Sequence, residues 1–186
     1  LHWIVRTKRE DREALPAKWG LVQFGSRDAK RAASQINARA ETAAEKPSFR
    51  DAMKRRRCLI PADGFYEWQK LGKGKQPWLL RMKDARPFAF AGLWSQWKTP
   101  PGGATLETCA ILTTTPNELT ATVHDRMPVI LPQTTWSRWL DEAAQGPPLT
   151  ELLVSFPAGQ MGAFPVSKRV NSPAKEGPDL IEPVQM

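Results

Sequence analysis

The most promising acid–base residue in this 186-residue chain is His124. It follows a short segment with helix-start signals and opens the polar cluster His124-Asp-Arg-Met-Pro128 between apolar stretches. Because an imidazole accepts or donates a proton near neutral pH, His124 is a candidate general acid or base. The alternative is a surface-loop histidine without a function. His2 has no comparable context, and we treat it as incidental.

A carboxylate among aromatic residues is the second candidate. Glu67 lies in Phe65-Tyr-Glu-Trp68, where strand alternation places Phe65 and Glu67 on one face and the other two residues on the opposite face. Three aromatic neighbours partly desolvate the carboxyl group, which raises its pKa and makes it a usable proton donor or acceptor. The alternative is a strand-end glutamate that reaches solvent or pairs with a lysine.

The third candidate is a group of anchoring residues in Asn37-Ala-Arg-Ala-Glu41. In an extended segment, Asn37, Arg39 and Glu41 would share one face. An amide can fix a carbonyl or backbone group, and a guanidinium can hold a phosphate with two hydrogen bonds. The alternative is the surface of a helix, which the intervening alanines also allow.

The sequence offers no obvious nucleophile or metal site. Cys58 and Cys109 lie inside apolar β segments, where thiols act as small hydrophobic groups. Two cysteines without C-x-x-C spacing, together with two histidines, are too few for a transition-metal site. We therefore expect neither a metal nor a cofactor.

Composition leaves two explanations for the basic charge. Lysine and arginine outnumber aspartate and glutamate by 27 to 19, which gives a net charge of +8, and eight tryptophans accompany one tyrosine. Cations and flat rings suit single-stranded nucleic acid, but a solvated surface around a tryptophan-rich core fits equally well. No apolar run approaches the roughly 20 residues of a membrane span, and no secretory leader opens the chain. We expect a cytoplasmic protein, which would associate with the nucleoid if its charge serves to bind DNA.

Positioning these residues requires a sheet of short strands. The pattern predicts strands over 1–5 and 19–24, with a hairpin loop over 6–13 and a polar loop or short helix over 25–35. Further strands separated by Gly and Pro turns are expected at 58–61, 64–68, 78–82, 88–97, 107–114, 127–131 and 163–167. Regular turn signals between short strands favour an antiparallel sheet. The predicted fold class is α+β: a single domain over 1–186, built on a mostly antiparallel, barrel-like sheet with a few short peripheral helices.

Three helices are expected around this sheet. Ser48 and Asp51 resemble a capping box for a helix that runs to about Arg56. Thr115-Pro-Asn-Glu118 predicts a second, short helix that begins with Thr115 as its cap. A third helix, capped by Thr134 or Thr135, carries a stripe of core residues, namely Trp136, Trp139 and Leu140.

Several motifs together resemble one family, the SRAP (SOS response-associated peptidase) domain. In chain order they are Ile36-Asn-Ala-Arg-Ala-Glu-Thr42, Lys46-Pro-Ser-Phe-Arg50, Arg57-Cys-Leu-Ile-Pro-Ala-Asp-Gly-Phe-Tyr-Glu-Trp68, Phe90-Ala-Gly-Leu-Trp94, Ile111-Leu-Thr-Thr114, His124-Asp-Arg-Met-Pro128, Phe164-Pro-Val-Ser167 and Val170-Asn-Ser172. The resemblance extends over nearly the whole chain, and the Arg57–Trp68 block is its most specific part.

The resemblance implies a sensor of abasic sites in single-stranded DNA that acts as a monomer without a cofactor. Members of this family attack the open-chain aldehyde with an N-terminal cysteine and form a thiazolidine DNA–protein crosslink; lyase and self-processing peptidase activities are also implied. Carried onto this sequence, Asn37 would orient the reacting terminus, Glu67 would transfer protons and His124 would act on the sugar oxygen. Arg39 and Arg126 would hold phosphates, and Trp68 would lie beside the pocket.

The chain departs from the family pattern at two places. The family's opening Cys-Gly-Arg segment is absent, so we expect that the chain lacks the family's N-terminal segment and is inactive by itself. After Trp19-Gly-Leu-Val22, where the family has proline and a DNA-wedging tryptophan, this chain has Gln23 and Phe24, and Phe24 could substitute as an apolar wedge. The alternative function is a non-catalytic module that binds single-stranded or modified-base DNA.

Overall fold

The computed structural model describes residues 1–9, 11–26, 35–98 and 102–185. Contacts divide the chain into two compact units. The first comprises Leu1–Pro61, Phe88–Thr114 and Pro128–Val154, and the second comprises Ala62–Pro87, Thr115–Met127 and Ser155–Met186. The single domain expected over 1–186 stays a prediction, and most of the loop or helix expected over 25–35 lies outside the described residues.

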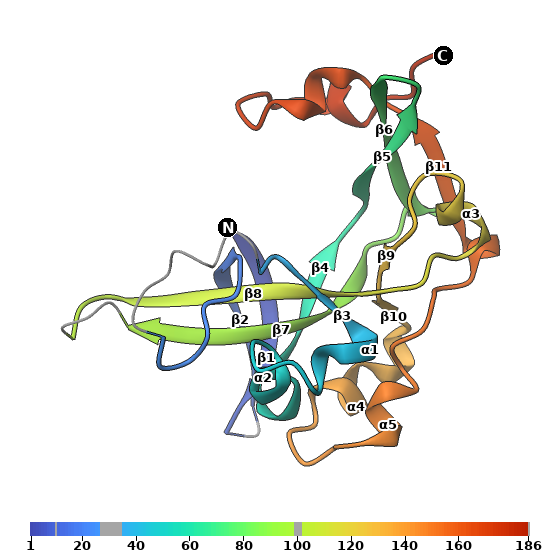
Figure 1. The fold of residues 1–186 in the computed structure, drawn as a ribbon. Coiled ribbons are helices and arrows are strands. Elements are labelled where there is room, and N and C mark those ends of the chain that lie inside the picture. The colour runs from blue at the N-terminus through green and yellow to red at the C-terminus, as the bar shows by residue number, and fades with distance from the viewer. Residues whose placement is uncertain (10, 27–34, 99–101, 186) are drawn as a thin grey trace. The chain divides into compact units, whose positions relative to one another are not determined.

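The first unit contains a closed barrel of five strands (Figure 1). These are β1 (His2–Lys8), β2 (Asp11–Trp19), β4 (Arg57–Ala62), β7 (Phe88–Lys98) and β8 (Thr105–Thr114). Strands follow the order β7-β4-β1-β2-β8, and pairing of β7 with β8 closes the barrel. The β1–β2, β1–β4 and β7–β8 pairs are antiparallel, whereas β2 and β8 run parallel. The predicted barrel-like, mostly antiparallel sheet is therefore confirmed.

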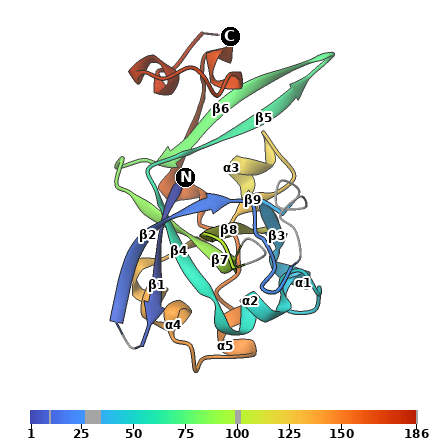
Figure 2. The ribbon, with the colours of Figure 1, turned by 90° about the vertical axis from the view of Figure 1, so that its left-hand side faces the viewer.

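Short elements complete this unit. Strand β3 (Asn37–Arg39) runs parallel to β8, and β10 (Ile130–Leu131) pairs with β7. The remaining elements are α1 (Ala40–Ala43), α2 (Arg50–Arg55), the 3-10 turn η2 (Gln133–Thr135), α4 (Trp136–Leu140) and α5 (Pro147–Thr150). Helices α2, α4 and α5 lie near one another in both ribbon views (Figures 1 and 2). All are short, so their stability comes from packing rather than from helix propensity.

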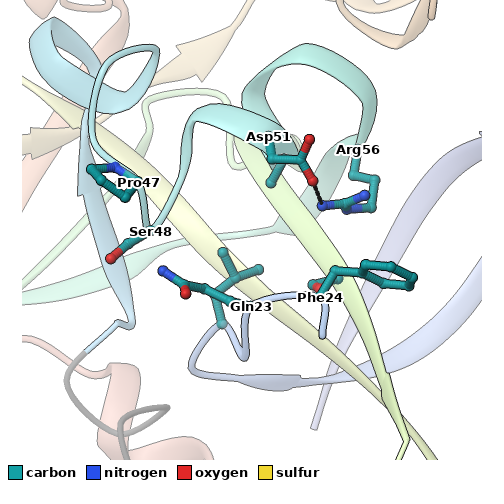
Figure 3. A pocket seen from close by; sticks show the side chains of 9 residues that line it. Gln23, Phe24, Pro47, Ser48, Asp51 and Arg56 are labelled. Carbon is teal, nitrogen blue, oxygen red and sulfur yellow. Dashed lines mark hydrogen bonds and ion pairs between the residues drawn. The ribbon is translucent and has the colours of Figure 1, made fainter. Parts of the chain in front are cut away.

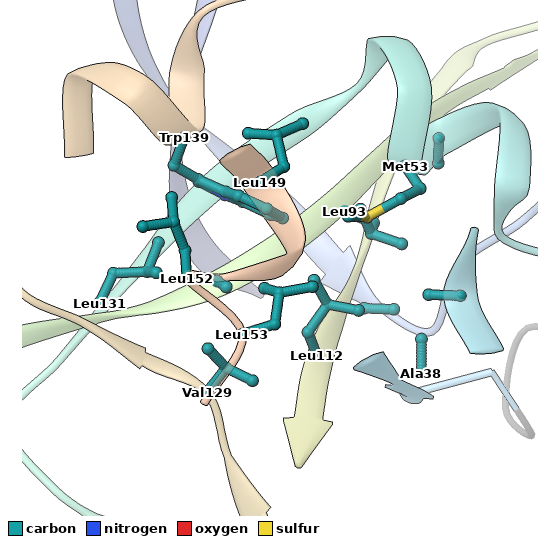
Figure 4. Packing of buried hydrophobic residues seen from close by; sticks show 14 of the residues in the cluster. Ala38, Met53, Leu93, Leu112, Val129, Leu131, Trp139, Leu149, Leu152 and Leu153 are labelled. Carbon is teal, nitrogen blue, oxygen red and sulfur yellow. The ribbon is translucent and has the colours of Figure 1, made fainter. Parts of the chain in front are cut away.

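The core of the first unit gathers around Trp139 (Figure 4). This side chain is fully buried, and its indole N–H donates to the Cys58 carbonyl oxygen at 2.9 Å. Met53 of α2, Leu112 of β8 and Leu149 of α5 belong to the same buried cluster. The expectation that the helix at 136–140 faces the core is confirmed, with Trp136 only partly buried.

The second unit contains a three-stranded antiparallel sheet in the order β11-β6-β5 (Figure 2). Its strands are β5 (Phe65–Leu71), β6 (Gly74–Met82) and β11 (Met161–Pro165). The short elements of this part of the chain are α3 (Glu118–Ala121), β9 (Met127–Pro128), η3 (Ala158–Gln160), η4 (Lys168–Asn171) and η5 (Pro178–Ile181).

Two strand predictions near the start of the chain were wrong. The charged segment 6–13 is mostly strand, because opposite charges pair across β1 and β2: Arg6 Nε donates to Glu13 Oε1 at 2.6 Å. The buried Arg6 guanidinium also pairs with Glu107 at 3.0 Å and stacks on Trp94 at 3.8 Å. The strand expected over 19–24 does not form: β2 ends at Trp19, and Gly20, with φ +119, leaves the extended conformation.

Two helix caps also differ from expectation. Helix α2 begins at Arg50 with Phe49 at its N-cap and no side-chain cap, so the capping box of Ser48 and Asp51 does not form. At α3, Asn117 rather than Thr115 is the cap, and its Oδ1 accepts from the Thr120 N–H at 2.8 Å. Among the described residues, no helix has the length and apolar character to cross a membrane.

Candidate functional site

Glu67 lies at the centre of β5, where it pairs in register with Trp78 of β6. The flanking residues Tyr66 and Trp68 are half-buried, as is Glu67 itself. Burial raises the pKa of the Glu67 carboxyl group, the neighbouring His124 lowers it, and Asp125 raises it again, with a net increase above the ordinary value of 4.5. The sequence-based expectation of a desolvated carboxyl group at this position agrees with this geometry.

His124 follows α3, whose two ends are both anchored. At the start, the Asn117 Nδ2 donates to the Phe156 carbonyl oxygen at 2.6 Å in addition to capping the helix. At the end, the His124 backbone N–H donates to the Thr120 carbonyl oxygen at 2.8 Å. Hydrogen bonds at both ends of α3 therefore hold the backbone of His124 in place.

The His124 ring has hydrogen-bond partners for both of its protonation states. Its Nδ1 accepts from the Arg126 backbone N–H at 3.1 Å when it carries no proton. When protonated, the same nitrogen lies 3.2 Å from both the Arg126 carbonyl oxygen and Asp125 Oδ1. These contacts orient the imidazole ring, which suits a candidate general acid–base residue.

His124 acts on the carboxyl group of Glu67 within the second unit, although many residues separate the two in the chain. Asp125 acts on the same carboxyl group, and both His124 and Asp125 line an open groove of about 360 Å³. Trp68, Lys70, His124 and Asp125 line that groove. A carboxyl group of raised pKa beside an imidazole can pass protons to and from a substrate.

The groove also has an aromatic wall. The indole N–H of Trp68 donates to Asn171 Oδ1 of η4 at 2.7 Å, which fixes the plane of the ring. Lys70 supplies a basic group to the groove lining, and Arg126, the phosphate-binding candidate, is half-buried and bonds the His124 ring through its backbone N–H. An oriented indole next to basic groups is typical of a surface that stacks unpaired bases.

Asn37 and Arg39 belong to the first unit. Both side chains are exposed on β3, with buried Ala38 between them, and the strand is held by parallel pairing with Ile111–Thr113 of β8. Glu41 does not share their face, because the chain turns into α1 at Ala40. The three-residue face expected at 37–41 is therefore reduced to two residues. The placement of Asn37 and Arg39 beside Glu67 stays a prediction.

Phe24, the candidate wedge, borders a separate hollow in the first unit (Figure 3). Its ring is 69% exposed and lies 5.4 Å from the Arg56 guanidinium. Arg56 in turn bonds Asp51 at 2.5 Å, which lowers the pKa of that carboxyl group. A large apolar ring kept at the surface beside a cation can contact an unpaired base.

Both cysteines are buried, as the sequence predicts. Burial raises the pKa of the Cys58 thiol well above its ordinary value and raises that of Cys109 to about 11. Neither thiol therefore supplies a nucleophile near neutral pH. Across the described ranges, no group of three or more His, Cys, Asp or Glu side chains is placed to hold a metal ion.

Sequence reasoning missed two supporting residues, Gln69 and Asn171. Gln69 follows Glu67 by two positions, so strand alternation alone could have placed it on the same face. Its amide connects β5 to the end of α3. No sequence signal indicates the bond from Trp68 to Asn171, because it depends on how η4 packs against β5.

Comparison with known proteins identifies the family of the chain. The family model for "SOS response associated peptidase (SRAP)" matches residues 1–173. The chain belongs to the SRAP family. Among SRAP relatives, it is 48% identical over 167 residues to the abasic site processing protein YoqW of Bacillus subtilis, covering 89% of this chain and 74% of the relative. It is 30% identical over 199 residues to the abasic site processing protein HMCES of Gallus gallus, covering 95% of this chain and 59% of that protein.

Solved structures show the same SRAP fold. A crystal structure of a protein from Bacteroides thetaiotaomicron superposes with a TM-score of 0.88 at 29% identity, covering 98% of this chain and 81% of the other. A second structure, from Bordetella bronchiseptica, has a TM-score of 0.77 at 30% identity, with coverage of 89% and 83%. The family membership expected from the motifs is therefore confirmed.

Proposed function

We propose that this SRAP chain is the core of a protein that processes abasic sites in single-stranded DNA, as part of the DNA damage response. The observation that carries the proposal is the Glu67–His124 pair, a carboxyl group of raised pKa coupled to an imidazole beside an aromatic-walled groove. Relatives named as abasic site processing proteins support the choice of substrate.

The proposed product is a thiazolidine crosslink. An abasic deoxyribose opens to an aldehyde, the α-amine of an N-terminal cysteine adds to its carbon, and loss of water gives an imine. The cysteine thiol then adds to the imine carbon and closes the five-membered ring. Cys58 and Cys109 lack an adjacent free amine and are buried, so the nucleophile would come from a cysteine outside these 186 residues.

Each step needs a proton to move, and the site supplies two carriers. Glu67 would protonate the departing hydroxyl group during imine formation and accept the thiol proton during ring closure. His124 would protonate the sugar ring oxygen as the C–O bond opens, and would take that proton back from the resulting hydroxyl group during reversal. The same pair could support β-elimination at the abasic site and self-processing of a leader, which are the lyase and peptidase activities expected for the family.

The DNA would be held by charge and stacking. A net charge of +8 favours a polyanion, and Arg39 and Arg126 would hold phosphates on either side of the lesion. Trp68 and Phe24 would stack on bases, which requires that those bases are unpaired. The DNA would therefore be single-stranded, and we take the binding species to be a monomer.

The test is adduct formation. Full-length protein with its N-terminal cysteine, incubated with a single-stranded oligonucleotide bearing one abasic site, should give a band that survives denaturation. An intact oligonucleotide and a borohydride-reduced abasic site, which has no aldehyde, should give none. A double Cys58→Ala, Cys109→Ala variant should still crosslink. Tight binding of abasic DNA without any adduct would instead favour the alternative, a non-catalytic DNA-binding module.

Phe24 should contribute to affinity rather than to chemistry. Because stacking on one base is worth about 1–3 kcal/mol, Phe24→Ala is expected to weaken binding of single-stranded DNA about tenfold, measured by fluorescence anisotropy. Phe24→Trp should bind at least as well as the wild type. Val154→Ala removes another exposed apolar side chain of the same unit, which is 60% exposed, and serves as the control. Equal affinities for Phe24→Ala and Val154→Ala would remove Phe24 from the DNA interface.

A further inference from the structure

Both polar atoms of the Gln69 side-chain amide form hydrogen bonds within the second unit. Its Oε1 accepts from the Trp78 indole N–H at 3.1 Å, and its Nε2 donates to the Thr122 carbonyl oxygen at 2.8 Å. An indole nitrogen is only a donor and a carbonyl oxygen is only an acceptor, so the amide has a single orientation that satisfies both. Gln69 is therefore a fixed link between strands β5 and β6 and the end of α3.

The position of this link connects the two acid–base residues. Gln69 lies two residues after Glu67 on β5, so the two side chains leave the same face of the strand. Thr122 is the C-cap of α3, and His124 follows it by two residues. One end of the link therefore lies on the strand that carries the carboxyl group, and the other lies on the segment that carries the imidazole.

We propose that Gln69 is the positioning residue of the Glu67–His124 pair. By tying the end of α3 to β5, it sets the distance between carboxylate and imidazole, while Asn117 anchors the opposite end of the same helix. The role in chemistry rests on the proposed function, but the role in geometry does not. A mispositioning of about 1 Å at a reacting group can lower a rate by about 10²-fold.

The charged groups that act on Glu67 make this geometry measurable. His124 and Asp125, both on the segment after α3, act on its carboxyl group with opposite signs, and the facing β6 residue, Trp78, is uncharged. If the segment moves away from β5, the influence of His124 on the pKa of Glu67 must fall. This influence can be read without DNA, from the carboxyl carbon resonance of Glu67 in a pH titration.

The variant is Gln69→Met, which keeps the length of the side chain and removes both hydrogen bonds. The matched control is Gln76→Met in the same sheet, because Gln76 Nε2 bonds the carbonyl oxygens of Pro77 and Val166 and makes no link to α3. In the wild type and in the control, replacing His124 by asparagine should raise the pKa of Glu67. In the Gln69→Met background, the same replacement should have at most half that effect.

Crosslinking gives the second readout. Gln69→Met should form the adduct at least tenfold more slowly at saturating abasic DNA, with DNA affinity unchanged within twofold, whereas Gln76→Met should keep the wild-type rate. An equal effect of His124→Asn on Glu67 in the Gln69→Met and Gln76→Met backgrounds would overturn the positioning role. If Gln69→Met fails to fold, Gln69→Ala provides the same comparison. Because the titration needs no substrate, its outcome is independent of whether any adduct forms.

Discussion

Glu67→Gln is expected to slow crosslink formation at an abasic site by about 10²- to 10⁴-fold, the usual contribution of a general acid–base residue. Glutamine keeps the shape and hydrogen-bonding capacity of the side chain but cannot exchange a proton. Affinity for abasic DNA should change by less than threefold, because the substitution adds no bulk. The measurement is the single-turnover rate of adduct formation, with binding measured separately by anisotropy.

Glu118→Gln is the control for the change in charge. Glu118 is exposed on α3 in the same unit, so its replacement alters the net charge equally without touching the site. Its crosslinking rate should equal that of the wild type. An unchanged rate in Glu67→Gln would count against the acid–base role and favour a module that only binds DNA.

The raised pKa of Glu67 also means that Glu67→Gln should lower activity without lowering the stability of the fold. Below pH 4.5 the carboxyl group is protonated in both folded and unfolded chains, so it contributes nothing to the difference. As the pH rises through 4.5 the unfolded chain ionises first, and folding becomes less favourable until the pH passes the higher pKa of the folded state. Above the pKa of the folded state the folded protein carries the full penalty, so Glu67→Gln should there be at least as stable as the wild type.

Arg57→Met is expected to lower the free energy of unfolding by about 4 kcal/mol. The buried guanidinium donates to five carbonyl oxygens: Nε to Trp139 at 2.8 Å, Nη1 to Met53 at 2.9 Å and Lys54 at 2.8 Å, and Nη2 to Ala144 at 3.2 Å and to Asp141. Arg57 therefore donates hydrogen bonds to carbonyl oxygens that would otherwise be unpaired, at the ends of α2 and α4 and in the loop after α4. Methionine fills similar space but leaves these acceptors without donors.

Thermal and guanidinium chloride unfolding would measure this effect. For a chain of this length, 4 kcal/mol corresponds to a fall in Tm of about 12 °C. Arg55→Met is the matched control, because Arg55 is an exposed residue two positions earlier, and it should cost less than about 0.5 kcal/mol. Similar losses for the two variants would show that the carbonyl bonds of Arg57 add little to stability.

The barrel could be predicted because its strands carry local signals. Apolar stretches and Gly or Pro turns mark the barrel strands β4, β7 and β8, as well as β5 and β6 of the three-stranded sheet, and these strands form where expected. Local signals failed where tertiary contacts determine the secondary structure. Arg6 lies in a strand because its charge is paired with Glu13 and Glu107. Likewise, Asn117 rather than Thr115 caps α3, because its amide also reaches Phe156. A propensity rule cannot include a partner that is distant in sequence.

The individual residues of the candidate site could be predicted from the sequence, but their spatial arrangement could not. Glu67 and His124 each stand out through their own neighbours in the sequence, an aromatic run and a polar cluster. Their mutual coupling depends on Gln69, which connects two segments that are far apart in the chain. Arg57 illustrates the same limit, because a basic run at a helix end suggests exposure, whereas this arginine is buried among carbonyl oxygens.

The burial of both cysteines makes the protein suitable for selective labelling. Cys58 and Cys109 are the only thiols in the sequence, and both are closed inside the first unit with pKa values that suppress the thiolate. A maleimide or disulfide reagent can therefore reach them only when the barrel opens. The rate of their modification therefore reports how fast the barrel opens. A terminal cysteine joined to this chain could be labelled much faster, without mutating either native thiol.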